Sequence, residues 1–227
     1  MSGKLFLVPT PIGNLGDMTY RAVEVLKSVD IILAEDTRNS AHLLSHYQID
    51  TSMQAYHAHN EHAHTEKLLS EMRNGRTLAI ITDAGTPGIS DPGFLLLRAC
   101  VENNLSVEVL PGATAFVPAL VLSALPNHEF TFIGFLPAKK GRKSQLSKLK
   151  NEHRTMIFYE SPHKIQRTLA DLIAYFGENR MASLSRELTK KFEETLRGNL
   201  SELYQISIER KLKGEMVLVV EGNKSLI

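Results

Sequence analysis

The chain is poor in cysteine and in long apolar runs. Its 227 residues include a single cysteine, Cys100. One cysteine cannot form an internal disulfide, and Cys100 lies in an apolar helical pattern, so we expect a buried thiol in a reducing compartment. A membrane-spanning helix needs about 20 apolar residues, and only residues 5–8 separate Lys4 from Pro9 at the N-terminal end, too few for a signal peptide. These absences predict a soluble, cytoplasmic protein.

The chain also lacks an excess of charge of either sign. It has 26 Lys and Arg residues against 25 Asp and Glu residues, a net charge of +1 and an isoelectric point near 7.9. This balance excludes a globally basic nucleic-acid binder, so any contact with nucleic acid must be regional. The hydrophobic content of 43% is ample for a packed core, and the length fits one large domain or two small ones.

Two common nucleotide-binding signatures are missing. The Rossmann pattern G-x-G-x-x-G is absent, because Gly13 and Gly16 supply only G-x-x-G. The P-loop pattern G-x-x-x-x-G-K-[ST] also fails, because Gly134 and Gly141 are too far apart. These absences argue against nucleotide hydrolysis at a Walker site, a common NAD enzyme and a Rossmann-type methyltransferase.

The most informative segment that is present is the loop of residues 82–93. It follows the apolar run 78–81, which predicts a buried strand, and precedes the apolar residues 94–97, which predict a helix. The loop therefore lies at the carboxyl end of a strand, where open α/β sheets bind ligands. Its three glycines allow close approach of a ligand and its two prolines fix its shape, which is more than an ordinary strand-to-helix connection needs. It predicts a small-molecule pocket.

Apolar periodicity predicts an α/β protein with two domains, 1–115 and 116–227. The first half alternates strands with helices, and its strand-end loops should converge on one edge. Its predicted strands are 5–8, 31–34, 54–56, 78–81 and 107–110, and its strand-end loops are 9–16, 35–39, 82–93 and 111–115. The pattern changes near residue 127. The second half has predicted strands at 130–135, 155–159, 181–185 and 216–220, and helices at 144–151, 163–176 and 199–210.

Four histidines between residues 56 and 64 suggest a metal site as one alternative. His57 and His59 would share a face of an extended strand, and His62 could join them. However, no cysteine or carboxylate stands at a recognised ligand spacing, so a solvated loop is favoured over a metal site. Lining of a polar site by His57 or Asn60 is the more plausible functional interpretation.

A basic segment, residues 139–150, contains no acidic residue. Its charged residues are Lys139, Lys140, Arg142, Lys143, Lys148 and Lys150. Gly141 and the preceding Leu136 and Pro137 predict a loop from which the first charges project. A solvated surface run is the alternative, but the lack of compensating acids favours contact with the phosphate backbone of a nucleic acid, without reading of its sequence.

Six ordered segments carry a resemblance to a known family. They are residues 7–17, 34–38, 82–93, 110–115, 158–164 and 185–190. Together they strongly resemble the ribosomal RNA small-subunit methyltransferase I family, tetrapyrrole-methylase-like enzymes that methylate a cytidine 2′-hydroxyl of 16S ribosomal RNA. Relatives that act on tetrapyrroles or diphthine have a central loop closer to Gly-Gly-Asp-Pro. This chain has Ala-Gly-Thr-Pro at 84–87, which favours the RNA branch.

The resemblance implies a two-domain class III methyltransferase fold and a homodimer. It further implies a mostly parallel N-terminal sheet, a mixed C-terminal sheet and S-adenosylmethionine in the cleft between the domains. The cofactor contacts implied by the family are Ile12, Ala84, Gly85, Thr86, Ile89, Thr114, Ala115, Glu160 and Leu188. Backbone groups at 84–86 can hydrogen-bond a methionine moiety. Ile12 and Leu188 could equally be core residues.

Methyl transfer from a sulfonium to an oxygen needs alignment and the removal of one proton. It requires no metal, because the leaving group is neutral. Asp83 and Glu160, each after a predicted strand, are the candidate proton acceptors; Asp83 could instead cap its loop, and Glu160 could pair with Arg186 or Lys164. Arg38 and Arg186 suit RNA contact, because guanidinium groups bind phosphate bidentately and stack on bases.

Two other functions fit parts of the sequence. A methylase of a tetrapyrrole or another small molecule would use the same loops, and a non-catalytic RNA-binding protein could retain the same fold. The basic segment favours RNA over a tetrapyrrole. Turnover of the cofactor distinguishes an enzyme from a binding protein.

Overall fold

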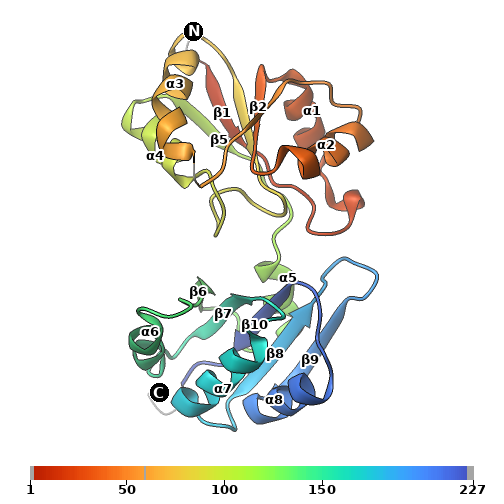
Figure 1. The fold of residues 1–227 in the computed structure, drawn as a ribbon, viewed down its shortest axis with the longest axis vertical. Coiled ribbons are helices and arrows are strands. Elements are labelled where there is room, and N and C mark those ends of the chain that lie inside the picture. Colours follow the sequence, from red (N-terminus) through yellow and green to blue (C-terminus); the bar gives the residue numbers. More distant parts are fainter. Residues whose placement is uncertain (1–2, 59, 224–227) are drawn as a thin grey trace. The chain divides into compact units, whose positions relative to one another are not determined.

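The computed structural model describes residues 3–58 and 60–223 of the chain. The chain divides into an N-terminal unit, Met1–Thr114, and a C-terminal unit, Ala115–Ile227. Each unit consists of one five-stranded sheet covered by helices (Figure 1). None of the helices within the described residues is long and apolar enough to cross a bilayer.

The N-terminal unit has an all-parallel sheet in the order β3-β2-β4-β1-β5. Its strands are β1 (Lys4–Leu7), β2 (Ile31–Ala34), β3 (Met53–Ala55), β4 (Leu78–Ile81) and β5 (Ser106–Val109). Its helices are α1 (Tyr20–Ser28), α2 (Thr37–His46), α3 (Glu61–Arg73) and α4 (Phe94–Glu102), with a short 3-10 helix, η1 (Leu15–Asp17). The parallel sheet predicted for this part of the chain is confirmed.

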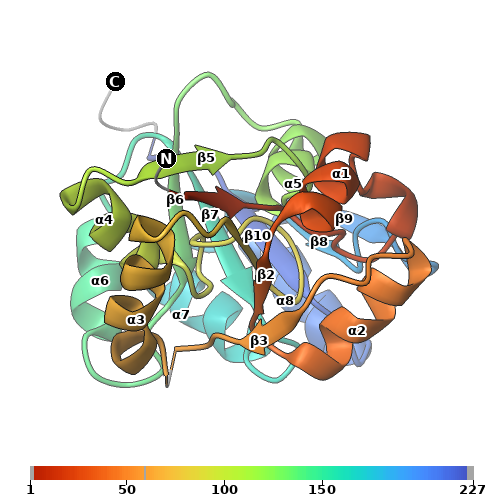
Figure 2. The same cartoon turned by 90° about the horizontal axis from the view of Figure 1, so that it is seen from above.

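Alternate residues of the central strands pack into two cores, one on each face of this sheet. Leu78 and Ile80 of β4 pack with residues of α3 and α4, whereas Ala79 and Ile81 pack with residues of α1 and α2. Figures 1 and 2 both show α1 and α2 on one side of the sheet and α3 and α4 on the other. Because both faces are covered, the central strands β2 and β4 are continuous apolar runs, which is why the sequence reveals them.

Helix α3 contains His62, one member of the proposed metal alternative. It starts at Glu61, so His62 lies on a helix and cannot share an extended strand with His57. Before the helix, the Asn60 side chain accepts the backbone N–H of His57 at 2.8 Å and donates to the carbonyl of Ala55 at 3.1 Å. Asn60 thus braces the turn between β3 and α3.

The C-terminal unit has a mixed sheet in the order β6-β7-β10-β8-β9. Only β6 and β7 are parallel, which confirms the predicted mixed sheet. Its strands are β6 (Phe130–Phe135), β7 (Thr155–Glu160), β8 (Met181–Arg186), β9 (Glu194–Asn199) and β10 (Met216–Val220). Its helices are α5 (Phe116–Ser123), α6 (Arg142–Leu149), α7 (Ile165–Phe176) and α8 (Leu200–Glu209).

The main core of the C-terminal unit lies between one face of this sheet and the helices α6, α7 and α8. Phe158 of β7 and Leu218 of β10 pack there against Leu169 and Leu172 of α7 and Leu203 of α8. Helix α5 contacts the sheet through β7, β8, β9 and β10. Both faces of the central strand β10 are consequently buried, and all five of its residues are inaccessible to solvent.

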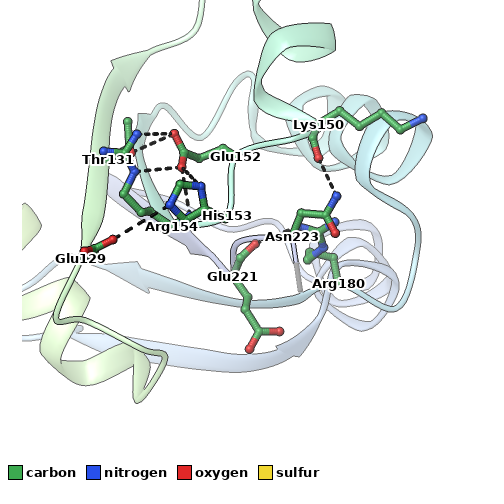
Figure 3. Close-up of polar contacts among 9 residues, drawn as sticks. All are labelled: Glu129, Thr131, Lys150, Glu152, His153, Arg154, Arg180, Glu221 and Asn223. Carbon is green, nitrogen blue, oxygen red and sulfur yellow. Dashed lines mark hydrogen bonds and ion pairs between the residues drawn. The ribbon is translucent and has the colours of Figure 1, made fainter. Parts of the chain in front are cut away.

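A polar cluster holds the segment that follows β10 (Figure 3). Asn223 donates its backbone N–H to the carbonyl of Glu152 at 2.7 Å and its side-chain amide to the carbonyl of Lys150 at 3.3 Å. Arg180 donates to the carbonyl of Glu221 at 3.1 Å. The Glu152 carboxylate accepts bonds from Arg154 at 2.9 and 3.0 Å, and this guanidinium lowers the pKa of Glu152 to about 2. The exit of the central strand is therefore tied to the turn between α6 and β7.

Candidate functional site

The carboxyl edge of the N-terminal sheet contains a topological switch point between β1 and β4. These strands are neighbours, but α1 leads from β1 toward β2 on one side, whereas α4 leads from β4 toward β5 on the other. In open α/β sheets, ligands bind in the crevice outside the carboxyl ends of strands at such a point. The loops 8–16 and 82–93 begin there.

Three strand-end loops are joined to one another at this edge. Thr10 and Gly85 exchange backbone hydrogen bonds of 2.9 and 3.0 Å, and the Thr10 hydroxyl donates to the carbonyl of Thr82 at 3.0 Å. The Thr86 hydroxyl donates to the carbonyl of Ala113, in the loop after β5, at 3.2 Å. The loops after β1, β4 and β5 thus form one braced surface, as their convergence in the sequence analysis predicts.

Gly85 occupies the centre of this surface, which we call the switch-point loops (residues 8–16, 82–93 and 110–114). Its φ of +84° is in the left-handed region that favours glycine. An added Cβ would lie 3.6 Å from Ile12 Cγ2 and 3.8 Å from the Ala113 carbonyl oxygen. Ile12 is 8% exposed, whereas Ile89 on the same loop as Gly85 is 39% exposed. Gly85 itself is buried and its neighbours Ala84 and Thr86 are half-buried, so polar backbone groups lie there beside apolar side chains, which suits a ligand with polar and apolar ends.

Acidic side chains gather beside the switch-point loops, where β2 and β4 end. Asp83 is exposed and accepts a hydrogen bond from Asn39 at 3.3 Å. Asp36 caps α2 and pairs with Arg38 at 2.7 Å, and these bonds lower the pKa of Asp36 to about 2.

Glu35 is a residue that the sequence analysis does not single out. Burial raises the pKa of the Glu35 carboxyl; the Asp83 N–H opposes this rise and the Asp83 charge reinforces it. Glu35 directly follows β2, so its strand-end position is the signal that could have identified it.

Glu160, in the C-terminal unit, is buried and held by two hydrogen bonds. The Thr168 hydroxyl donates to one carboxylate oxygen at 2.5 Å, and the backbone N–H of Ser161 donates to the other at 2.7 Å. The residue is 6% exposed. These partners, rather than Arg186 or Lys164, satisfy Glu160 among the described residues.

The structure corrects the prediction that the first charges of the basic segment, including Arg142, project from a loop. Arg142 is 4% exposed, and its guanidinium pairs with Asp171 at 2.7 Å. A guanidinium held in this way would have to leave Asp171 and Thr168 before it could bind an RNA phosphate, so RNA contact by Arg142 stays a prediction that its burial does not favour. The lysines of the segment are exposed, namely Lys139, Lys140, Lys143, Lys148 and Lys150.

The remaining predicted residues differ in how accessible they are. Arg38 has an 88% exposed side chain, whereas that of Arg186 is 16% exposed and pairs with Glu194 at 3.1 Å. Leu188 is 7% exposed, in keeping with its alternative as a core residue. Thr114 ends the N-terminal unit and Ala115 precedes α5 in the C-terminal unit; both are half-buried.

Comparison with known proteins assigns the family. A model of the family "Tetrapyrrole (Corrin/Porphyrin) Methylases" matches residues 4–204. The chain belongs to this methylase family. Ribosomal RNA small subunit methyltransferase I of Synechocystis sp. is 49% identical over 97% of this chain and 79% of its own length. The protein of the same name from Escherichia coli O157:H7 is 47% identical over 98% of this chain and 79% of its own length. The resemblance carried by the six segments is therefore confirmed.

Solved structures share the fold of this methylase. A diphthine synthase superposes with a TM-score of 0.75 at 12% identity, over 97% of this chain and 90% of its own. A uroporphyrin-III C-methyltransferase from Thermus thermophilus, complexed with S-adenosylhomocysteine, gives a TM-score of 0.66 at 16% identity, over 96% of this chain and 97% of its own. The predicted tetrapyrrole-methylase-like fold is confirmed.

The histidines of this methylase offer no metal site in the part of the chain that the structure describes. No group of three or more His, Cys, Asp or Glu side chains is arranged there to hold a metal ion. His59, one member of the predicted alternative, lies outside the described residues. His64 bonds instead to Gln54 at 3.1 Å.

Proposed function

We propose that this methylase transfers a methyl group from S-adenosylmethionine to the 2′-oxygen of a cytidine in 16S ribosomal RNA. The observation that carries the proposal is the 47–49% identity to ribosomal RNA small subunit methyltransferase I over nearly the whole chain. The switch-point loops supply the ligand-binding edge that such a reaction needs. We further propose that the protein acts in the cytoplasm on the small ribosomal subunit or its RNA and forms a homodimer.

The switch-point loops fit the cofactor. Gly85 lets a ligand approach the backbone, Ile12 and Ile89 offer apolar contact to a purine, and Ala84 and Thr86 flank Gly85 with backbone polar groups. When bound, S-adenosylmethionine supplies a methyl group on a sulfonium, which leaves as a neutral thioether. Contacts by Thr114, Ala115, Glu160 and Leu188 remain predictions from the family.

The chain's own residues must align the ribose oxygen and take its proton. As the new oxygen–carbon bond forms and the sulfur–carbon bond breaks, the 2′-hydroxyl proton passes to a base or to water. Asp83 and Glu160 remain the predicted acceptors. Glu35 is a third candidate, because it directly follows β2 at the carboxyl edge of the sheet and burial raises its pKa. Glu160 accepts two bonds already, which favours a role in holding a ligand hydroxyl over a role as base.

RNA contact is proposed for the exposed lysines Lys139, Lys140 and Lys143 and for Arg38. Their ammonium and guanidinium groups can neutralise phosphates without reading sequence. Arg186 stays a prediction, but its ion pair with Glu194 would have to open before it could bind RNA.

The decisive experiment supplies purified protein with methyl-labelled S-adenosylmethionine and either small ribosomal subunits or free 16S ribosomal RNA. Nuclease digestion and mass spectrometry should find the label on a cytidine ribose, with and without chelator. Label on a base atom would refute the ribose assignment, and loss of activity in chelator with return on zinc would refute a metal-free reaction. Label on an added tetrapyrrole alone, or no turnover despite RNA binding, would favour the two alternative functions.

A further inference from the structure

A buried chain of polar side chains in the C-terminal unit joins the basic segment to Glu160. In the sequence, Arg142 follows Lys139 and Lys140 and precedes Lys143. The three lysines are exposed, whereas Arg142 is buried, with only 4% of its surface exposed. Burying a guanidinium is costly unless every part of it is paired. The arrangement of its partners therefore shows what the buried charge holds in place.

The guanidinium of Arg142 bonds to three residues that lie in two segments of the chain. Its Nε donates to Asp171 Oδ2 at 2.7 Å, and its Nη1 donates to the carbonyl of Pro137 at 3.3 Å. Its Nη2 donates to the Thr168 hydroxyl at 2.9 Å. One planar group thus fixes the start of the basic segment, through Pro137, against helix α7, which carries Thr168 and Asp171.

Thr168 passes this connection on to Glu160. Its hydroxyl has one hydrogen, which it donates to Glu160 Oε2 at 2.5 Å while accepting from Arg142. Thr168 is fully buried, and the three residues form a continuous relay from guanidinium through hydroxyl to carboxylate. Hydrogen bonds in such chains strengthen one another in a low-dielectric interior.

We propose that Arg142 and Thr168 are positioning residues that couple RNA binding by the basic segment to cofactor binding at Glu160. This inference rests on the proposed function. An RNA phosphate that fixes Lys139, Lys140 and Lys143 also fixes the Pro137–Arg142 turn, and through Thr168 it fixes the carboxylate of Glu160. Coupling between two ligands is reciprocal, and its usual range is about 5- to 150-fold in affinity.

The chain offers matched variants for testing the relay. Thr168→Val removes the hydroxyl and keeps the shape, whereas Thr168→Ser restores a hydroxyl. Arg142→Lys keeps the charge but loses the planar fork. Arg167→Lys is the control for Arg142→Lys, because Arg167 approaches the same Asp171 oxygen at 3.9 Å from the solvent side, with a 61% exposed side chain.

The experiment titrates S-adenosylhomocysteine by calorimetry into the full chain, with and without saturating 16S ribosomal RNA. In the wild type and in Thr168→Ser and Arg167→Lys, RNA should raise the affinity at least about fivefold. In Thr168→Val and Arg142→Lys this factor should fall toward one, while RNA alone still binds. If Arg142→Lys fails to fold, the comparison of Thr168→Val with Thr168→Ser decides the test.

Two outcomes would overturn the relay. One is a folded Thr168→Val variant that keeps the wild-type coupling factor, which would reduce the buried chain to a purely structural role. The other is a wild type that binds and methylates RNA but shows no coupling. Both differ from failure of the proposed function, in which the wild type would bind neither ligand or would methylate no RNA.

Discussion

The two units place their predicted functional residues by different means. In the N-terminal unit, the switch-point loops are joined by backbone bonds between Thr10 and Gly85, and glycine geometry shapes the surface. In the C-terminal unit, the Ser161 backbone N–H holds one oxygen of Glu160, and the buried side chain of Thr168, itself bonded to Arg142, holds the other. The first arrangement depends on where strands end, and the second depends on which side chains meet across the core.

This difference decides which kind of substitution should disturb each unit. A surface made by backbone is sensitive to any added side chain at a close approach, whatever its polarity. A surface made by buried polar groups is sensitive to loss of one partner, since the others are left unsatisfied. The predictions below test this contrast, beginning with the largest expected effect.

Gly85→Val should weaken binding of S-adenosylmethionine more than tenfold, equivalent to about 1.4 kcal/mol. The added methyl groups would occupy the ligand's approach, and a β-branched residue is strained at a φ of +84°. Gly177→Val is the matched control, because Gly177 has a φ of +88° and no atom within 4 Å of an added Cβ. Calorimetry that finds equal affinity in wild type and folded Gly85→Val would contradict the proposed cofactor surface.

Changing Lys139, Lys140 and Lys143 together to Ala should lower RNA affinity and flatten its salt dependence. Each lost phosphate contact removes about 0.7 to 0.9 from the slope of log affinity against log salt, so the three should remove about 2 to 3. Affinity should be measured by filter binding across salt concentrations. The control changes three other exposed lysines, Lys27, Lys211 and Lys213. An unaltered slope in the first variant would leave the basic segment as a solvated surface only.

Glu152→Gln should destabilise the protein by about 1 kcal/mol at neutral pH, since it removes charge-assisted bonds to Arg154. The folded-state pKa of Glu152 is lowered from 4.5 to about 2, so its stabilisation is present above pH 4.5 and is lost as the pH falls toward 2. The free energies of unfolding of wild type and variant, measured with urea, should therefore become equal as the pH falls from 4.5 toward 2. A constant difference would contradict the assigned pKa.

Glu35→Gln should have the smallest effect. In contrast to Glu152→Gln, it should raise the free energy of unfolding relative to wild type at neutral pH. Because burial raises the pKa of Glu35 above 4.5, its favourable contribution is present below pH 4.5 and is lost as the pH rises through the folded-state pKa. As the pH rises through the pKa of Glu35, the variant should become more stable than wild type by under about 1 kcal/mol, because the site is partly solvated. If urea unfolding from pH 4 to pH 7 shows no increase in the stability of Glu35→Gln relative to wild type, the raised pKa of Glu35 is contradicted.

The sequence allowed most of the N-terminal unit to be predicted. Its central strands β2 and β4 are continuous apolar runs, and because all strands of the sheet are parallel, the loops that follow them meet at one edge. The position of the loop 82–93 at a strand end could therefore be predicted without tertiary information. The strand-end position of Glu35 could also be predicted, but its raised pKa could not, because that depends on burial beside Asp83, which lies far away in the sequence.

The C-terminal unit could be predicted less completely. Strand β9 was missed because residues 194–199 lack apolar alternation and form a polar edge of the sheet. Arg142 was predicted to be exposed because its neighbours are basic, but its burial depends on Thr168 and Asp171, which lie one helix and one strand further along the chain. Such partners are fixed by packing and not by local composition.

The central place of β10 in the C-terminal sheet has a consequence for synthesis on the ribosome. Until β10 emerges, β7 and β8 have no strand between them, so the two halves of this sheet cannot join. The strands of the N-terminal unit, in contrast, are all present once residue 109 has been made. Folding during synthesis should therefore complete the switch-point loops early. The sheet that carries Glu160 stays incomplete until its last strand is made, and in that period the C-terminal unit is more prone to bind chaperones or to aggregate.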